Sequence, residues 1–386
     1  MVIRKLMPED LEKHCHVSSM AFIWSVDLEK EALPENPVLG AFDDDNNILA
    51  ELEYFPHEAF FCKKALPAVG IGGVGSLPEF RRKGSVRALF EEMERLSEET
   101  GWVLGFLYPF SYDYYRKFGY EAVIKKISLN AKAKALEAVP RCAGSLTMYT
   151  GQNSQELYDL YNKIARNTNL MFKRNDDTYF SAKPLKNTLY TYIWRYESGE
   201  AGAIVTYSLD RSTKTLNIKE LFYLDKAALL GVLGFLRGYD GQAQFFDFEK
   251  LPTDSTLLHV LNEYNLTSMN ISYSAAARIY NLEELLRQNE YPQEHGHFKL
   301  LSLDSYKRNA GIFEVEYQNG TAQVTRRSSG DFDISLTAPA AAKLLLSGEG
   351  FSAETAAYLS GVELRNKASD FFKAFPQRVT FLCDGF

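Results

Sequence analysis

The stretch IGGVGSLPEFRRKGSVRALF, residues 71–90, carries the strongest structural signal in the sequence. Its glycine-rich apolar start is typical of a buried strand, and from Ser85 onward the apolar residues recur at steps of three and four, which predicts an amphipathic helix. Between strand and helix, three cations stand directly before Gly84. These cations are Arg81, Arg82 and Lys83. The sequence therefore predicts a strand, a basic glycine turn and a helix in succession.

The basic turn has the chemistry of a phosphate site. The first N–H groups of a helix lack intrahelical partners and the helix dipole is positive there, so they can bind an anion that nearby arginines neutralise. Gly84 has no Cβ, which lets the backbone approach a pyrophosphate closely. A solvated basic helix start is the alternative. The strand before the turn and the helix after it favour a phosphate loop.

The turn is neither of the two commonest phosphate loops. It has no Gly-x-x-x-x-Gly-Lys-Ser/Thr pattern, and no Gly-x-Gly-x-x-Gly followed by an acidic residue about twenty positions later. Its Arg-Arg-x-Gly-x-Val pattern, residues 81–86, resembles the acyl-CoA pyrophosphate loop of GNAT acetyltransferases, with Val86 in place of the usual small last residue. This resemblance implies a GNAT fold with acetyl-CoA as co-substrate.

A second motif follows in PFSYDYYRKFGY, residues 109–120, after an apolar strand pattern. It resembles the GNAT signature Tyr-x-x-x-Gly-Phe/Tyr, which places Tyr115 where the family's general acid protonates the departing CoA thiolate. A phenol with an ordinary pKa of about 10 is protonated at neutral pH and can donate to a sulfur anion. The alternative is a core or surface aromatic. Two linked motifs favour the catalytic role.

Length and charge limit the possible partners. At 386 residues the chain is long enough for two or three domains of about 100–200 residues each. The net charge of −7 argues against nucleic acid as the main partner, because binding a phosphate backbone needs a broad basic surface. A cationic small-molecule substrate suits this charge better.

The composition predicts a soluble cytoplasmic protein without a membrane contact. The first residues lack the apolar core of a signal peptide, and no stretch approaches the roughly 18 apolar residues of a membrane span. The four cysteines are far apart and form no Cys-x-x-Cys pair, as expected of reduced thiols. Cys383 has no nearby histidine, so we interpret it as a small buried residue rather than a nucleophile.

Metal binding is not expected. His14 and His16 flank Cys15, and His295 and His297 flank Gly296. Neither pair has a third histidine at a helical step that would complete a zinc site.

The order of elements predicts two related domains. Residues 1–130 read as one αβ unit, which includes a first helix from Asp10 and a hairpin around the Asp/Asn-rich turn at 43–47. A polar connector is expected at 131–145. The same order then recurs more faintly, so we interpret residues 131–286 as a second GNAT-like domain.

The second copy differs from the first at the turn. Asp225 stands where the first copy has its basic glycine turn. An aspartate there caps a helix well but repels a pyrophosphate, so we expect the second copy to bind no CoA and to have a structural role as one wall of the substrate cleft.

Residues 287–386 read as a third domain. Alternating stretches predict a strand meander, two apolar helices follow at 338–346 and 353–359, and 378–382 alternates like a last strand. This order resembles a sterol-carrier-like fold. Tandem GNAT domains before a sterol-carrier-like domain resemble the Eis family of GNAT acetyltransferases, and the expected fold class is therefore α/β (α+β) throughout.

The Eis resemblance assigns roles to individual residues. It makes Tyr115 the general acid and the chain's own C-terminal carboxylate, on Phe386, the base. The apolar end at 381–386 supports a packed terminus, because free ends are usually polar, although the terminus could simply lie beside a strand. By the same resemblance the pantetheine contacts are Val74 and Ser76, and the other cofactor contacts are Arg81, Arg82, Lys83, Gly84, Ser85 and Ser111.

The resemblance also implies a substrate class and an assembly. Acidic residues near the C-terminus help the family to receive polycationic aminoglycosides, and Asp384 is the nearest such carboxylate here. Trp24 and Asp27, near the end of the first helix, are further candidates for the substrate cleft. A small-molecule amine acceptor and a homo-oligomer, a hexamer, are therefore expected.

Two non-catalytic alternatives stay open at this point. The third domain could carry a hydrophobic ligand, and the chain could be a scaffold that has lost catalysis. Arg81, Gly84 and Tyr115 argue against the scaffold, because a chain without catalysis has no need of them. Stabilisation by acetyl-CoA would separate the enzyme from both alternatives.

Overall fold

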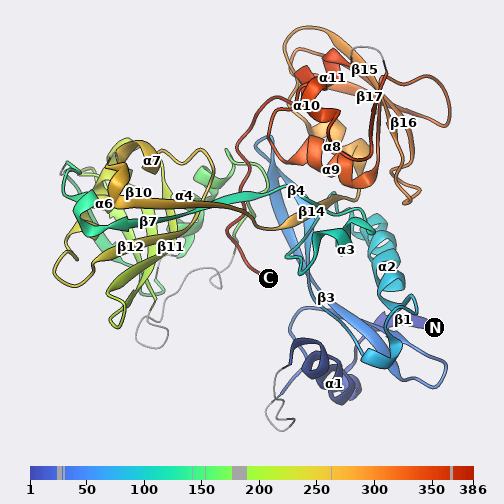
Figure 1. The fold of residues 1–386 in the computed structure, drawn as a ribbon, viewed down its shortest axis with the longest axis horizontal. Helices are drawn as coiled ribbons and strands as arrows, with labels where there is room; N and C mark the ends of the chain where they lie inside the picture. The colour runs from blue at the N-terminus through green and yellow to red at the C-terminus, as the bar shows by residue number, and fades with distance from the viewer. Residues whose placement is uncertain are drawn as a thin grey trace.

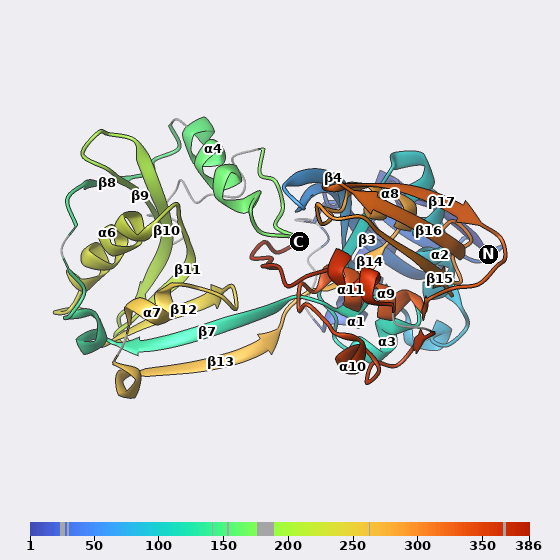
Figure 2. The same ribbon diagram turned by 90° about the horizontal axis from the view of Figure 1, so that it is seen from above.

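The computed structural model describes residues 1–23, 28, 31–140, 142–152, 154–175, 189–261, 263–365 and 368–386. Two of the predicted substrate residues, Trp24 and Asp27, lie outside the described residues. The described strands form three sheets, of seven, seven and five strands (Figures 1 and 2). No helix in the described ranges is long and apolar enough to cross a membrane. The mixed α/β class predicted from the sequence is confirmed.

The first sheet contains the strand and helix predicted from residues 71–90. Its parallel pair, β4 and β5, is connected by helix α2, Ser85–Thr100, which buries Leu89, Phe90 and Met93 against the sheet. Helix α1, Leu11–Phe22, covers part of β3 and β4. In sheet order the strands are β1 (Val2–Lys5), β2 (Val38–Phe42), β3 (Ile48–Phe61), β4 (Lys64–Ser76), β5 (Leu104–Leu107), β14 (Ala276–Ile279) and β6 (Glu121–Ala122).

Local chemistry explains the start of this sheet. The Asp43 carboxylate accepts hydrogen bonds from the N–H groups of Asp45, at 3.0 Å, and Asn47, at 2.7 Å, which closes the predicted hairpin turn between β2 and β3. Asp10 stands at the N-cap of α1 as predicted, but its side chain does not cap that helix. Its carboxylate instead binds the Arg4 guanidinium, at 2.6 Å, and so ties the helix start to β1.

The second sheet repeats this plan. Its parallel pair, β11 and β12, is connected by α6 (Lys226–Arg237), and α4 (Ser154–Ala165) packs on β10 and β11. The short helix α7 is Leu257–Val260. In order the strands are β13 (Thr267–Tyr273), β7 (Lys125–Lys132), β12 (Phe245–Leu251), β11 (Thr215–Tyr223), β10 (Ala201–Asp210), β9 (Tyr190–Arg195) and β8 (Ser145–Met148).

The predicted boundary at residue 130 does not separate the strands of the first two sheets. Strand β7 spans that position and pairs with β12 and β13 in the second sheet. Strand β14, far later in the chain, returns to pair with β5 in the first sheet. The stretch 131–145, predicted as a connector, thus begins with the end of β7. The three-domain division at 130 and 286 stays a prediction.

The third sheet lies at the C-terminal end of the chain. Helices α8 (Leu282–Gln288), α9 (Ala338–Leu346), α10 (Ala353–Ala356) and α11 (Ser369–Ala374) accompany it. The predicted last strand at 378–382 is wrong: Thr380 forms only an isolated bridge with Asn169, because this segment bonds to residue 169 instead of the sheet. The strands are β17 (Thr321–Arg327), β16 (Gly311–Gln318), β15 (Gly296–Ser302), β18 (Ile334–Leu336) and β19 (Val362–Leu364).

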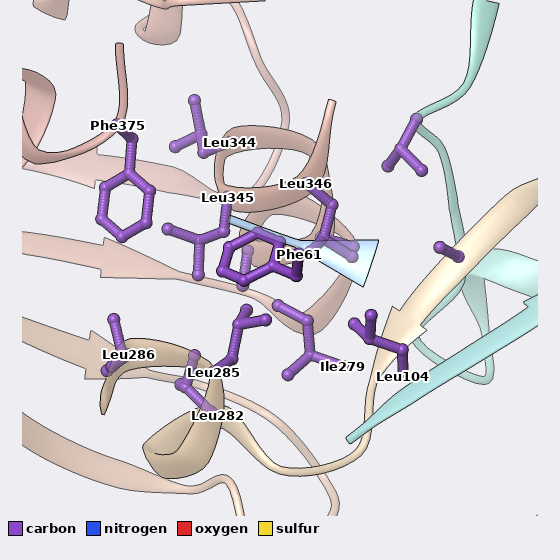
Figure 3. Close-up of a cluster of buried hydrophobic side chains, with 14 of the residues drawn as sticks. Phe61, Leu104, Ile279, Leu282, Leu285, Leu286, Leu344, Leu345, Leu346 and Phe375 are labelled. Carbon is purple, nitrogen blue, oxygen red and sulfur yellow. The ribbon is translucent and has the colours of Figure 1, made fainter. Parts of the chain in front are cut away.

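One apolar core joins the third sheet to the first. Figure 3 shows Phe61 of β3 surrounded by leucines of α8 and α9, with Leu104 of β5 and Ile279 of β14 beside them. All of these side chains are buried, and each buried aliphatic or aromatic side chain contributes about 1.5–3 kcal/mol by leaving water. This shared core fixes the third sheet against the first, and the last residues of the chain emerge beside it.

Candidate active site

The parallel strands β4 and β5 part in the middle of the first sheet. They pair from Ala68 opposite Leu104 to Ile71 opposite Leu107, after which β5 ends and β4 continues to Ser76. The Leu77 N–H donates to Leu49 O at 3.2 Å, toward β3. Because N–H groups alternate sides along a strand, the Ser76 N–H points to the opposite edge, which β5 has left. Val74 lies in the bulge that shifts the pairing of β3 with β4 between Gly72 and Gly75, so the predicted pantetheine contacts lie beside an open strand edge.

The basic turn presents an uncapped helix N-terminus. Gly84 is the N-cap of α2, and no side chain caps the helix or places an acid in its first turn. Its φ is +90°, and a Cβ at Gly84 would meet no atom within 4 Å, so the space beside it is open. Arg82 also has a positive φ, of 63°. The side chains of Arg81, Arg82 and Lys83 are exposed in the same turn, and the buried Ser85 begins the helix.

The corresponding turn of the second sheet is closed. The Asp225 carboxylate accepts a hydrogen bond from the Ala228 N–H at 2.9 Å and so caps α6, as predicted. This carboxylate satisfies one of the free amides and places a negative charge where the first sheet has cations. An anion therefore has a favourable helix start in the first sheet only.

Tyr115 lies on the short helix α3, Tyr112–Arg116, which follows β5. Its side chain is buried against Phe90 of α2 and against Phe110. The Tyr115 ring centre lies 6.0 Å from that of Phe90 and 5.5 Å from that of Phe110. This burial raises the pKa of Tyr115, with a smaller contribution from Tyr114, so the hydroxyl keeps its proton at neutral pH. Ser111, predicted as a cofactor contact, caps α3 by accepting from the Tyr114 N–H at 3.3 Å. The motif thus places a protonated phenol beside α2.

The C-terminus is packed, as predicted, and reaches the point where β4 and β5 part. The Phe386 ring lies on Gly70, where a Cβ would come within 2.6 Å of it, and its terminal oxygen lies 3.6 Å from the Cβ position of Gly72. The rings of Tyr108 and Phe172 lie 5.2 and 5.7 Å from the Phe386 ring. The carboxylate therefore stands at the first residue of β4 beyond its pairing with β5.

A second carboxylate on the same face was missed by the sequence reasoning. Glu53 of β3 pairs with Gly72, so the two share one face of the sheet, and its Oε2 lies 4.0 Å from the Cβ position of Gly73. Burial raises the pKa of Glu53, against a hydrogen bond from Asn36 that lowers it. The alternation of Glu51 and Glu53 with apolar neighbours in β3 is the signal that could have indicated it.

Helix α1 closes the far end of this face. A Cβ on Gly75 would lie 3.0 Å from Val17 and 3.1 Å from Ala21, which shows how closely α1 packs there. The buried Glu51 binds His14, at 3.1 Å, and Ser18, at 3.0 Å, both on α1. Glu53 and the exposed Gly73 thus lie between α1 and the C-terminal residue.

Asp384, predicted to receive the substrate, is buried among the chain's own polar groups. One carboxylate oxygen accepts from the Arg174 guanidinium, at 2.6 and 2.9 Å, and the other accepts from the Tyr161 hydroxyl, at 3.2 Å. Cys383 beside it is buried, in agreement with its interpretation as a structural residue. Among the described residues, Phe386 and Glu53 therefore place carboxylates on the face beside the terminus.

A strand edge opened beside an uncapped helix N-terminus is the arrangement expected of an acyl-CoA-dependent transferase. Comparison with protein families agrees: residues 2–123 match the model of an acetyltransferase (GNAT) domain, and residues 170–279 match that of a second acetyltransferase (GNAT) domain. The chain thus contains two GNAT acetyltransferase domains, and the protein is an enzyme of the GNAT acetyltransferase class. Acetyl-CoA is the co-substrate of this class.

Solved structures match the chain over its whole length. A probable N-acyltransferase from Enterococcus faecalis V583 superposes with a TM-score of 0.86 at 23% identity, covering 100% of this chain and 99% of that one. A GCN5-related N-acetyltransferase from Anabaena variabilis gives 0.84 at 20% identity, and Eis1 from Mycobacterium abscessus gives 0.81 at 16%, each covering 100% of both chains. These likenesses show the fold. No curated protein matches the sequence.

Proposed function

We propose that the protein transfers the acetyl group of acetyl-CoA directly to an amine, with the C-terminal carboxylate of Phe386 as base and Tyr115 as general acid. The observation that carries the proposal is the place of this carboxylate: it lies beside Gly72, where β4 leaves β5. The Phe386 ring fills the space that a side chain at Gly70 would need, and its terminal oxygen lies within van der Waals distance of the Cβ position of Gly72.

Acetyl-CoA would be held by the open edge and the basic turn. Val74 and Ser76 would bond its pantetheine arm, and the amides of Gly84 and Ser85 would bind its pyrophosphate, whose charge the turn's cations would neutralise. The second GNAT domain would hold no CoA, because Asp225 already caps its helix. The Phe386 carboxylate and the Tyr115 hydroxyl would then lie on either side of the thioester.

The proposed reaction balances with these two groups. The amine nitrogen forms a bond to the acetyl carbon, and the carbon–sulfur bond breaks. The proton lost by the amine passes to the Phe386 carboxylate, directly or through water, because a carboxylate with an ordinary pKa of about 3.5 is a weak base. Tyr115 gives its proton to the departing thiolate. Amides at the end of β4 polarise the carbonyl, and positioning of the reactants supplies much of the rate.

Charge favours a polycationic amine as acceptor. Glu53 and the Phe386 carboxylate place two acidic groups on one face, and the whole chain carries a net charge of −7. Aminoglycosides and polyamines have the spaced ammonium groups that two carboxylates can bind. By resemblance to the Eis family we further propose a cytoplasmic hexamer whose third domain has a sterol-carrier-like fold.

Release of CoA, followed with a thiol reagent, tests this proposal on a panel of polyamines, lysine peptides and aminoglycosides. Turnover should fall by about 10²–10⁴-fold in Tyr115→Phe, the range typical of a lost acid–base group. Tyr112→Phe is the matched control on the same helix, where the Tyr112 hydroxyl donates to Ser274 O at 3.0 Å, and it should retain activity. The chain without Phe386 should lose turnover while acetyl-CoA still raises its unfolding midpoint. Full activity without Phe386 would refute the proposed base, and no turnover with any amine would refute the proposed transfer.

A further inference from the structure

Hydrogen bonds hold the last residues of the chain, from Val379 onward, to neighbouring segments. The Asn169 N–H donates to Val379 O at 2.9 Å, and the Phe381 N–H donates to Asn169 O at 3.1 Å. Residue 169 begins a segment that also bonds to β3, since the Leu170 N–H donates to Phe60 O at 2.6 Å. The tail therefore runs beside a segment that is itself fixed to the first sheet.

Farther along, Arg174 binds the tail from within the second GNAT domain. This residue is almost completely buried, and its guanidinium donates to Asp384 at 2.6 Å and also to Glu220 of β11. It stacks on the Tyr161 ring of α4, 4.1 Å from the ring centre. A buried guanidinium between two carboxylates is held in one place, because moving away from either partner would break a charge-assisted hydrogen bond out of contact with water.

Two strand ends of the second sheet complete the contact. The parallel pairing of β11 and β12 ends at Ile218 opposite Phe248. Glu220 and Lys250 each follow this last pair by two residues, and the Lys250 ammonium donates to Cys383 O at 2.7 Å. The second sheet thus parts as the first does, and beyond its last pair Lys250 binds the chain's own tail directly while Glu220 binds it through Arg174. The C-terminus accordingly lies between the two sheets in both views (Figures 1 and 2).

A metal ion is the competing explanation for this cluster. Glu220, Cys383 and Asp384 lie close enough together for their ligand atoms to share one ion, and they form the one such group found in the described ranges. The Arg174 guanidinium already contacts all three and supplies the positive charge that they require. A cation therefore already lies among these three ligands without a metal ion.

We propose that the second GNAT domain positions the catalytic carboxylate of Phe386. Arg174 is the positioning residue, because it binds Asp384, two residues before Phe386. This inference rests on the proposed role of Phe386. A displacement of a reacting group by about 1 Å can cost about 10²-fold in rate, so a fixed tail is a requirement for a base that belongs to a chain end. The domain that has lost its own anion site would then hold the first domain's base.

The test uses the full-length protein and the charge-removing variant Asp384→Asn. Its kcat should fall by about tenfold to a hundredfold, while the KM for acetyl-CoA changes less than about twofold. Digestion with a carboxypeptidase that releases C-terminal aromatic residues should free Phe386 faster from Asp384→Asn than from the native protein. The matched control is Arg195→Met, which breaks the pair with Glu156 in the same domain, at 2.7 Å, away from the tail. It should leave both measurements unchanged.

The decisive comparison is made in the chain that lacks Phe386. There Asp384→Asn should cause no further loss of turnover, because the group that it positions is already gone. An equal loss with and without Phe386, or a tail that stays protected from digestion, would overturn the inference. Unchanged turnover on removing Phe386 would instead refute the proposed function, and the digestion would still report on the tail. Should Asp384→Asn fail to fold, Tyr161→Phe removes one bond to the same carboxylate and is read in the same way.

Discussion

The ring of Phe386 lies directly on Gly70 of β4, so closely that a Cβ at this glycine would come within 2.6 Å of the ring. The last residue of the chain is thus seated on a strand more than 300 positions away in the sequence. Gly72 extends this seat under the terminal carboxylate. The absence of a side chain at Gly70 therefore leaves the space that the Phe386 ring occupies.

Gly70→Ala should displace the C-terminal residue. The added methyl group meets the Phe386 ring, and because the ring belongs to a chain end it should move instead of the strand. We expect a tenfold or greater loss of kcat, on the order of the cost of misplacing a reacting group, with little change in acetyl-CoA binding. Gly234→Ala is the control, since a Cβ on that glycine of α6 would meet nothing within 4 Å. Equal kcat values for the two variants would contradict the proposed contact between Gly70 and the Phe386 ring.

Gly84→Ala should weaken acetyl-CoA binding specifically. The φ of Gly84 is +90°, so alanine there costs about 1–2 kcal/mol in strain, and its methyl group would also occupy the open space beside the turn. Gly101 at the other end of α2 has a φ of +77° and equally open surroundings, which makes Gly101→Ala a control for strain alone. Both variants should lose similar stability in denaturant, and only Gly84→Ala should raise the Kd for acetyl-CoA in calorimetry. A matching rise for Gly101→Ala would argue against a phosphate contact at Gly84.

Glu53→Gln should raise the KM for polycationic amines. A hydrogen bond to a charged group is worth about 1.5–3 kcal/mol, which corresponds to roughly a tenfold to hundredfold change. Burial raises the pKa of Glu53, so on lowering the pH this carboxylate takes up its proton earlier than an exposed glutamate does. The KM of the native protein should therefore rise from that pH downward, and the KM of the variant should not. Kinetics across the acidic range measure both effects. Glu58→Gln on the same strand, where Lys173 pairs with the carboxylate at 2.7 Å, should change neither.

The pair of His14 and Glu51 should make stability depend on pH. The hydrogen bond with Glu51 raises the pKa of His14, and burial raises the pKa of Glu51, so the folded protein holds both protons more tightly than the unfolded chain. The contribution of His14 is complete below its ordinary pKa of about 6.5 and is lost as the pH rises through its raised pKa. We therefore expect His14→Gln to lower the free energy of unfolding at both pH values. The loss should be larger at about pH 6 than at about pH 9.

Urea unfolding of both proteins at the two pH values measures this difference. His295→Gln provides the control, because His295 forms an exposed pair with Glu316 at 3.2 Å, and such surface pairs contribute little. A difference for His14→Gln that grows with pH would contradict the assigned direction.

Much of the first domain could be predicted from the sequence because its signals are local. The apolar repeat of α2 and the turn at Asp43 are set by residues a few positions apart. Asp225 capped its helix as expected for the same reason. The stretch 378–382 failed as a strand although it alternates, because alternation does not say which neighbour a strand will find.

The sequence by itself determined the strand, basic turn and helix at 71–90 and the tyrosine motif after them, since propensity, capping and glycine geometry act within a turn or two of chain. Only the tertiary structure decided which groups meet at the site. Asp384 finds Arg174 across 210 positions, and Phe386 and Glu53 come together over Gly72. Such contacts depend on how three sheets pack, and no local pattern in the sequence encodes that packing.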